Sequence, residues 1–177
     1  MTLSPELYAR AQGIRLLVLD VDGVLTDGRL YYGANGEELK AFHIHDGLGL
    51  KLLHASGVEV AIVTGRTSRA VELRAENLGL PHVFQGVSDK LSVFEQLLAR
   101  FALEAPAVAA IGDDLPDLPV LRRCGFAACP PEASARLRGH AHYVTDRAGG
   151  RGAVREVCDL LMTAQGTLEA AMLAYFK

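Results

Sequence analysis

Cysteine is scarce in this sequence, with three residues among 177. Cys124, Cys129 and Cys158 are odd in number, and their spacing matches neither a zinc-binding nor a redox motif. We therefore expect reduced thiols, as in a cytoplasmic protein.

An excess of positive charge is also missing. The formal net charge is −3 and there is no long basic run, which disfavours a nucleic-acid surface. The apolar runs are short and broken by charge, so none is long enough to cross a bilayer. The first residues, MTLSPELYARAQ, lack the basic and then apolar pattern of a secretory signal. We expect a cytoplasmic protein with no nucleic-acid or membrane partner.

Half of the residues are hydrophobic, and a chain of this length suits one domain, which we expect over residues 1–177. Strand-like and helix-like segments alternate, which predicts an α/β, doubly wound, three-layer Rossmann-like fold around a parallel sheet. The expected strands are the apolar run from residue 16 to residue 19 and residues 58–63, 82–85, 107–111, 126–128 and 142–144. The expected helices span residues 4 to about 13, 48–56, 68–78 and 88 to about 102. A helical pattern appears again in the tail, residues 149–177.

One insertion interrupts this alternation. Residues 30–32 and 38–44 read as extended arms about the turn Gly33-Ala34-Asn35-Gly36, which predicts a β-hairpin within residues 28–44. The next helix is expected to open at Asp46-Gly47, with Ser88 as a plausible cap for a later one.

Polar residues follow three of the predicted strands. Asp20 and Asp22 follow the first, Thr64-Gly65-Arg66 the second, and Asp113-Asp114 a later one, and Lys90 comes from a loop. The carboxyl ends of parallel strands form the ligand crevice of open α/β sheets, so we expect these groups to converge.

Clustered carboxylates repel one another, and oxygen-only ligands suit Mg²⁺ better than zinc. A hydroxyl, backbone amides and a lysine suit a phosphate group. We expect Asp20 to be the nucleophile that takes a phosphoryl group. Asp22 would protonate the leaving oxygen and then accept a proton from water.

The segments DVDGVLTDG, TGR, QGVSDK and GDDLPD resemble the four motifs of the haloacid dehalogenase-like phosphatase superfamily. With HIHDG and GGRGAVRE, the chain resembles the 3-deoxy-D-manno-octulosonate 8-phosphate (KDO 8-phosphate) phosphatase family over about residues 10–165. The resemblance implies Mg²⁺ ligation by Asp20, by the backbone carbonyl of Asp22 and by Asp113. It implies that Thr64 and Lys90 hold the phosphoryl group.

The same resemblance implies a sugar-acid phosphate substrate, a step in lipopolysaccharide core sugar biosynthesis, and no separate cap domain. It implies a homotetramer in which the hairpin of one subunit covers the neighbour's site. Either Asp114 or Asp117 would orient Lys90 or the metal's waters. The residues implied in substrate binding are His43, Ile44, His45, Asp46, Gly47, Lys51, Gly65, Arg66, Arg74 and Lys90.

Several alternatives stay open on the sequence. Packing in the hairpin explains His43 and His45 as well as substrate contact does, and a plain turn explains the glycines around Arg151 as well as closure over a site. The substrate could instead be a nine-carbon 2-keto-3-deoxy acid 9-phosphate. A catalytically silent phosphate-binding or partner-binding module would lack the nucleophile or the metal ligands, which are intact. A phosphomutase would need a larger cap than a hairpin.

Overall fold

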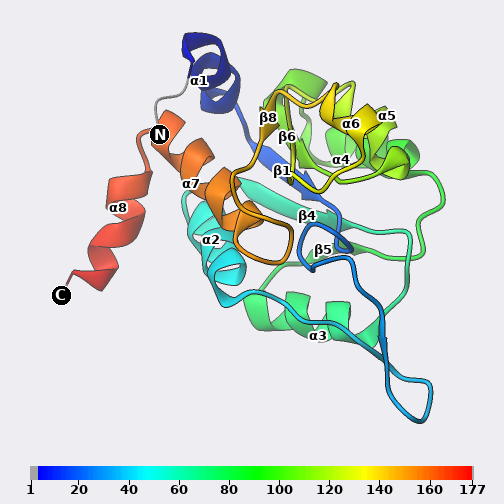
Figure 1. Ribbon diagram of the computed structural model, residues 1–177. Coiled ribbons are helices and arrows are strands. Elements are labelled where there is room, and N and C mark those ends of the chain that lie inside the picture. The colour runs from blue at the N-terminus through cyan, green and yellow to red at the C-terminus, as the bar shows by residue number, and fades with distance from the viewer. Residues whose placement is uncertain (1–3, 177) are drawn as a thin grey trace.

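The computed structural model describes residues 4–176, and within them six parallel strands form the central sheet (Figure 1). The strand order is β5-β4-β1-β6-β7-β8. The strands are β1 (Leu16–Leu19), β4 (Glu59–Val63), β5 (His82–Phe84), β6 (Val108–Ile111), β7 (Phe126–Cys129) and β8 (Tyr143–Val144). The predicted α/β fold with a central parallel sheet is confirmed.

Both faces of the sheet are covered by helices. In β1, Leu17 and Leu19 belong to one buried cluster, while Leu16 and Val18 belong to the other. Because successive strand residues point to opposite faces, a strand buried on both sides has an uninterrupted apolar sequence. The first cluster includes α1 (Pro5–Gln12), α2 (Ile44–Ala55), α3 (Arg69–Leu78) and α7 (Ala153–Ala164). The second includes α4 (Lys90–Phe101), α5 (Leu118–Leu121) and α6 (Ala135–Arg138).

Three expected boundaries were wrong. Helix α2 begins at Ile44 rather than Leu48, because His43 is its N-cap and the His43 Nδ1 accepts the N–H of His45 at 3.3 Å. The second hairpin arm is therefore shorter than expected and ends at Leu39. Helix α4 is capped by Asp89 rather than Ser88, because the Asp89 carboxylate accepts the first N–H groups of that helix.

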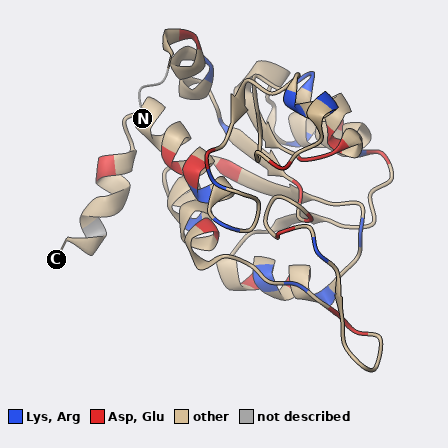
Figure 2. Cartoon of the chain, viewed as in Figure 1, with Lys and Arg blue, Asp and Glu red and all other residues tan. Residues whose placement is uncertain are grey.

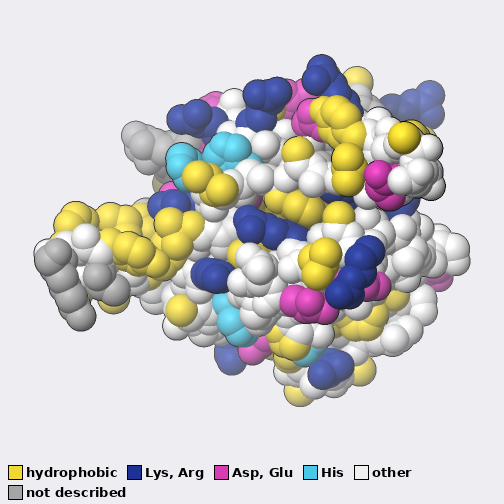
Figure 3. All heavy atoms as spheres, turned by 90° about the horizontal axis from the view of Figure 1, so that it is seen from below, with side chains coloured by type: hydrophobic (Ala, Val, Ile, Leu, Met, Phe, Trp, Pro, Cys, Tyr) yellow, Lys and Arg dark blue, Asp and Glu magenta, His cyan; other side chains and the backbone are white. Residues whose placement is uncertain are grey.

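The hairpin consists of β2 (Tyr31–Tyr32) and β3 (Glu38–Leu39), and its tip reaches away from the sheet at the lower right of Figure 1. At the opposite side, α8 (Leu168–Met172) projects from the body, and apolar side chains gather over it in Figure 3. Lys and Arg are interspersed with Asp and Glu along the chain (Figure 2). None of the helices in residues 4–176 is long and apolar enough to cross a membrane.

Candidate active site

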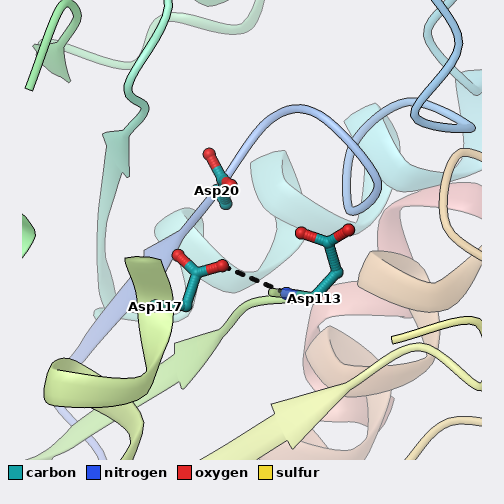
Figure 4. A group of neighbouring side chains, drawn as sticks. All are labelled: Asp20, Asp113 and Asp117. Carbon is teal, nitrogen blue, oxygen red and sulfur yellow. Dashed lines mark hydrogen bonds between the residues drawn. The ribbon is translucent and has the colours of Figure 1, made fainter. Parts of the chain in front are cut away.

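Three carboxylates gather at the carboxyl edge of the sheet, and we call Asp20, Asp113 and Asp117 the acidic cluster (Figure 4). Asp20 follows β1 and Asp113 lies just beyond β6. The two strands pair in register, Leu19 with Ile111, so both acids emerge at the same edge. Asp117 comes from the short 3-10 helix η2 (Leu115–Asp117). One oxygen from each acid lies within 4.8 Å of the others.

Gly23 allows the loop after β1 to fold against this cluster. Its φ is +83°, a conformation that glycine adopts without strain. A Cβ atom at Gly23 would lie 2.1 Å from the Asp113 Oδ2. A side chain at this position would therefore displace the Asp113 carboxylate.

Lys90 is the cation that contacts the acidic cluster. Its Nζ lies 2.9 Å from the Asp20 Oδ2 and 2.7 Å from the Asp117 Oδ1, and its side chain is only 5% exposed. The second Asp117 oxygen accepts the N–H of Asp113 at 3.1 Å. Asp114 is exposed and donates its N–H to the same oxygen at 3.4 Å. The sequence left open whether Asp114 or Asp117 contacts Lys90. In the structure, Asp117 accepts a hydrogen bond from the Lys90 ammonium.

Burial dominates the pKa values of two acids in this group, and Lys90 does not reverse its effect. Burial, with repulsion from Asp117, raises the pKa of Asp20 to about 6 even though Lys90 opposes the change. Burial and the neighbouring Asp117 and Asp20 raise the pKa of Asp113 to about 7. Burial disfavours the charged Lys90, yet the attraction of Asp117 and Asp20 prevails and raises its pKa. Crowded oxygen donors with raised pKa values fit a hard divalent cation such as Mg²⁺.

Thr64 and Gly65 follow β4, which pairs with β1, so they reach the same edge of the sheet. Thr64 is buried, and its Oγ1 accepts the N–H of Arg66 at 3.4 Å. Gly65 and Arg66 are exposed. The Thr64 hydroxyl and the exposed Gly65 therefore stand at the sheet edge that also carries Asp20.

A second group of charges, which we call the ribbon cluster, consists of Asp22, Glu38, Lys40 and Arg66. The Lys40 Nζ contacts the Asp22 Oδ1 and lies 2.9 Å from the Glu38 Oε1. Arg66 donates from Nη2 to the Glu38 Oε2, and its Nε lies 4.0 Å from the Asp22 Oδ2. Hydrogen bonds from Arg66 and Lys40 lower the pKa of Glu38. Asp22 thus points toward the hairpin base and does not join the acidic cluster with its carboxylate.

Glu38 and Lys40 belong to the ribbon cluster and were not among the residues that the sequence predicted for the site. They are two residues apart, so in an extended arm their side chains share one side. This opposite-charge pair at the end of the hairpin was the available signal.

Three hydrogen bonds fix the HIHDG segment to the rest of the fold. The buried Asp46 accepts the N–H groups of Gly152 at 3.3 Å and Arg155 at 2.8 Å, where α7 begins. Burial nevertheless raises the pKa of Asp46. Arg74 donates to the His43 carbonyl at 3.3 Å. A Cβ atom at Gly47 would lie 2.1 Å from the Arg74 Nη2, so the backbone packs closely on that guanidinium.

The remaining implied substrate residues lie at the surface. Ile44 is 74% exposed, and His45 and Lys51 are exposed on α2. His43 and His45 line a cleft of about 520 Å³ together with Arg151. Arg151 also lines a cleft of about 350 Å³ that contains Gly23 and Asp113.

Comparisons with known proteins agree with this geometry. A model of the haloacid dehalogenase-like hydrolases matches residues 48–125. The 3-deoxy-D-manno-octulosonate 8-phosphate phosphatase KdsC of Salmonella typhimurium is 52% identical over 169 residues, which are 96% of this chain and 90% of that protein.

Solved structures of similar proteins have the same fold. The 3-deoxy-D-manno-octulosonate 8-phosphate phosphatase of Moraxella catarrhalis, in complex with magnesium ion, phosphate ion and KDO, has a TM-score of 0.95 at 43% identity, covering 99% of this chain and 100% of that one. The corresponding phosphatase of Yersinia pestis has a TM-score of 0.93 at 49% identity, covering 94% of this chain and 90% of that one.

Proposed function

The chain belongs to the 3-deoxy-D-manno-octulosonate 8-phosphate phosphatases, within the haloacid dehalogenase-like hydrolases, and we propose that its acidic cluster and Lys90 hydrolyse that phosphate ester. The products are KDO and phosphate. The observation that carries the proposal is the meeting of Asp20, Asp113 and Lys90 at one edge of the sheet, in a chain 52% identical to a phosphatase of this specificity.

Mg²⁺ is the cofactor, and the carboxylates of Asp20 and Asp113 with the backbone carbonyl of Asp22 would hold it. When bound, it neutralises charge on the acids and on the phosphoryl group. Lys90 and the Thr64 hydroxyl bind the phosphoryl oxygens that do not react. Asp117 orients Lys90, because it accepts a hydrogen bond from the ammonium at 2.7 Å.

Asp20 attacks phosphorus, so that a bond forms between its carboxylate oxygen and phosphorus while the bond to the sugar oxygen breaks. Asp22 gives its proton to the departing alkoxide, which is a poor leaving group without one. In the second step Asp22 takes a proton from water, the resulting hydroxide attacks the aspartyl phosphate, and Asp20 is released as a carboxylate. The two steps sum to hydrolysis of the ester.

The sugar-acid end of the substrate carries a carboxylate that basic groups can bind. Arg66, Lys51 and the His43–Gly47 segment supply the contacts, with Arg74 bracing that segment. Arginine suits such a carboxylate because its planar guanidinium donates two parallel hydrogen bonds.

The active assembly is a homotetramer in which the hairpin of one subunit covers the neighbour's site. Two-residue strands give little stability alone, and Tyr31, Tyr32 and Leu39 are 42%, 63% and 55% exposed on the hairpin. A partner surface would bury these side chains. The enzyme is a single cytoplasmic domain, residues 1–177, that acts in lipopolysaccharide core sugar biosynthesis.

A phosphate-release screen over sugar-acid phosphates tests this function. We expect release from KDO 8-phosphate with Mg²⁺, none after EDTA treatment, and recovery when Mg²⁺ is returned. Faster turnover of a nine-carbon 2-keto-3-deoxy acid 9-phosphate would move the assignment to that substrate. No release from any member of the panel would leave a catalytically silent binding module instead.

A further inference from the structure

Lys40 is an almost fully buried lysine outside the four motifs. Its side chain is 1% exposed, and its ammonium lies between the carboxylates of Asp22 and Glu38. Burying an ammonium group is unfavourable unless carboxylates or other acceptors surround it. The fold therefore places Lys40 where both acids hold it, beside the residue expected to serve as acid and base.

The two oxygens of Asp22 differ in their surroundings. The Oδ1 atom contacts the Lys40 ammonium, whereas the buried Oδ2 has no hydrogen-bond partner among the described residues. The Arg66 Nε lies 4.0 Å from this oxygen. Lys40 thus fixes one oxygen, and the other is a buried acceptor that no described residue satisfies with a hydrogen bond.

The ribbon cluster also joins three separate segments of the chain. Asp22 comes from the loop after β1, Arg66 from the loop after β4, and Glu38 from β3. Glu38 forms an ion pair with Lys40 and accepts a hydrogen bond from Arg66, and Arg66 also donates to the Tyr32 Oη at 3.4 Å. The position of the Asp22 carboxylate therefore depends on how the base of the hairpin packs.

We propose that Lys40 is a positioning residue for Asp22, which holds the Oδ1 and presents the Oδ2 to the oxygen that leaves phosphorus. In that step the bond from phosphorus to the leaving oxygen breaks, the bond to Asp20 forms, and the proton on the Asp22 Oδ2 passes to the leaving oxygen. This proposal rests on the proposed function in taking Asp22 as the acid and base.

The test compares Lys40→Met with the wild type on KDO 8-phosphate, an alkyl phosphate, and on p-nitrophenyl phosphate, an aryl phosphate. Since general acid catalysis contributes roughly 10²- to 10⁴-fold, we expect kcat on the alkyl phosphate to fall about 10- to 100-fold. The aryl leaving group needs little protonation, so its kcat should fall much less. Lys40→Arg, which can still bridge both carboxylates, should recover most of the alkyl activity.

Arg122→Met provides the matched control, since Arg122 is an exposed cation after α5 and outside the site. It should leave both activities unchanged. In the double variant Lys40→Met with Asp22→Asn, we expect turnover no slower than in Asp22→Asn alone, because both changes remove the same proton transfer. Equal losses on the two substrates, or additive losses in the double variant, would overturn the proposal.

Glu38→Gln keeps the Lys40 contact with Asp22 and serves if Lys40→Met does not fold. It should give a smaller loss that is again confined to the alkyl phosphate, and a loss shared by both substrates would contradict the positioning role. If the wild type does not hydrolyse KDO 8-phosphate but hydrolyses another alkyl phosphate, the proposed substrate is wrong. The alkyl-to-aryl comparison is then made on that ester and still decides the role of Lys40.

Discussion

The acidic cluster and the ribbon cluster lie close together but differ in charge balance and in support. The acidic cluster sets three carboxylates against Lys90 and stands on the ends of buried strands. The ribbon cluster pairs two carboxylates with two cations and stands on loops and on a two-residue strand. The first is incomplete without a metal ion, whereas the second is neutral by itself. This difference supports the proposal that bonds break at the sheet edge and that the hairpin base aligns Asp22.

The largest expected effect separates chemistry from folding at Asp20. Asp20→Asn removes the nucleophile, and we expect turnover to fall roughly 10⁴-fold or more, as for the loss of other catalytic nucleophiles. The variant should keep its circular dichroism spectrum and its melting temperature, because the amide fits the same space. Retention of a substantial fraction of wild-type activity would show that the acidic cluster does not supply the nucleophile.

A smaller loss is expected at Asp117, which accepts a hydrogen bond from Lys90 and which we propose orients that lysine. Asp117→Asn should cost about 10- to 100-fold in activity or Mg²⁺ affinity, the range typical of residues that orient ligands. Asp114→Asn is the matched control, since the Asp114 side chain is exposed and its N–H donates to the Asp117 carboxylate. Activity measured as a function of Mg²⁺ concentration distinguishes the two variants. Equal losses of activity and Mg²⁺ affinity in both would contradict the proposal that Asp117 orients Lys90.

Removal of the hairpin tests the other half of the comparison. Deleting residues 31–38 should leave the sheet folded but impair assembly and substrate selection together. We expect a moderate loss of activity on KDO 8-phosphate. The ratio of kcat/KM between good and poor substrates should also decrease. Sedimentation and the substrate panel measure both properties. A shortened protein that stays tetrameric and selective would show that the hairpin is not the lid.

The smallest effect concerns stability, and it should be seen only in the metal-free enzyme. The folded-state pKa of Asp20 is about 6 and that of Asp113 about 7, against an ordinary 3.8. Below pH 3.8 both acids are protonated in the folded and unfolded chains alike. As the pH rises, the unfolded chain releases its protons first, so stability falls until the pH passes about 7.

Melting curves with EDTA and with Mg²⁺, at about pH 5 and about pH 8, measure whether stability falls as the pH rises. Mg²⁺ should raise the melting temperature more at the higher pH, because the metal binds the deprotonated acids. Asp113→Asn should melt higher than the wild type in EDTA at about pH 8 and should lose most of the response to Mg²⁺. A metal-free enzyme that gains stability over this range would contradict the raised pKa values.

The sequence predicted the acidic cluster better than the ribbon cluster for a physical reason. Apolar runs locate the buried strands, and the residues after them must lie at the carboxyl edge, so Asp20, Thr64 and Asp113 could be placed in advance. The choice between Asp114 and Asp117 needed the turn of η2, which buries Asp117 and exposes Asp114.

The sequence could not predict contacts between segments that are far apart in the chain. Asp46 meets the start of α7 more than a hundred positions away in the chain, and nothing in its local pattern indicates that partner. Lys40 is buried only because the hairpin base folds onto Asp22. The early start of α2 depends on a side-chain cap by His43, a residue that is not a common helix cap.

The most direct test of the central claim is to trap the covalent intermediate. Enzyme mixed with Mg²⁺ and KDO 8-phosphate is quenched in acid within one turnover, and its peptides are mapped by mass spectrometry. We expect one phosphoryl group, carried on Asp20 and absent from Asp20→Asn. A phosphoryl group on another residue, or full turnover with no phosphorylated enzyme at any quench time, would contradict it.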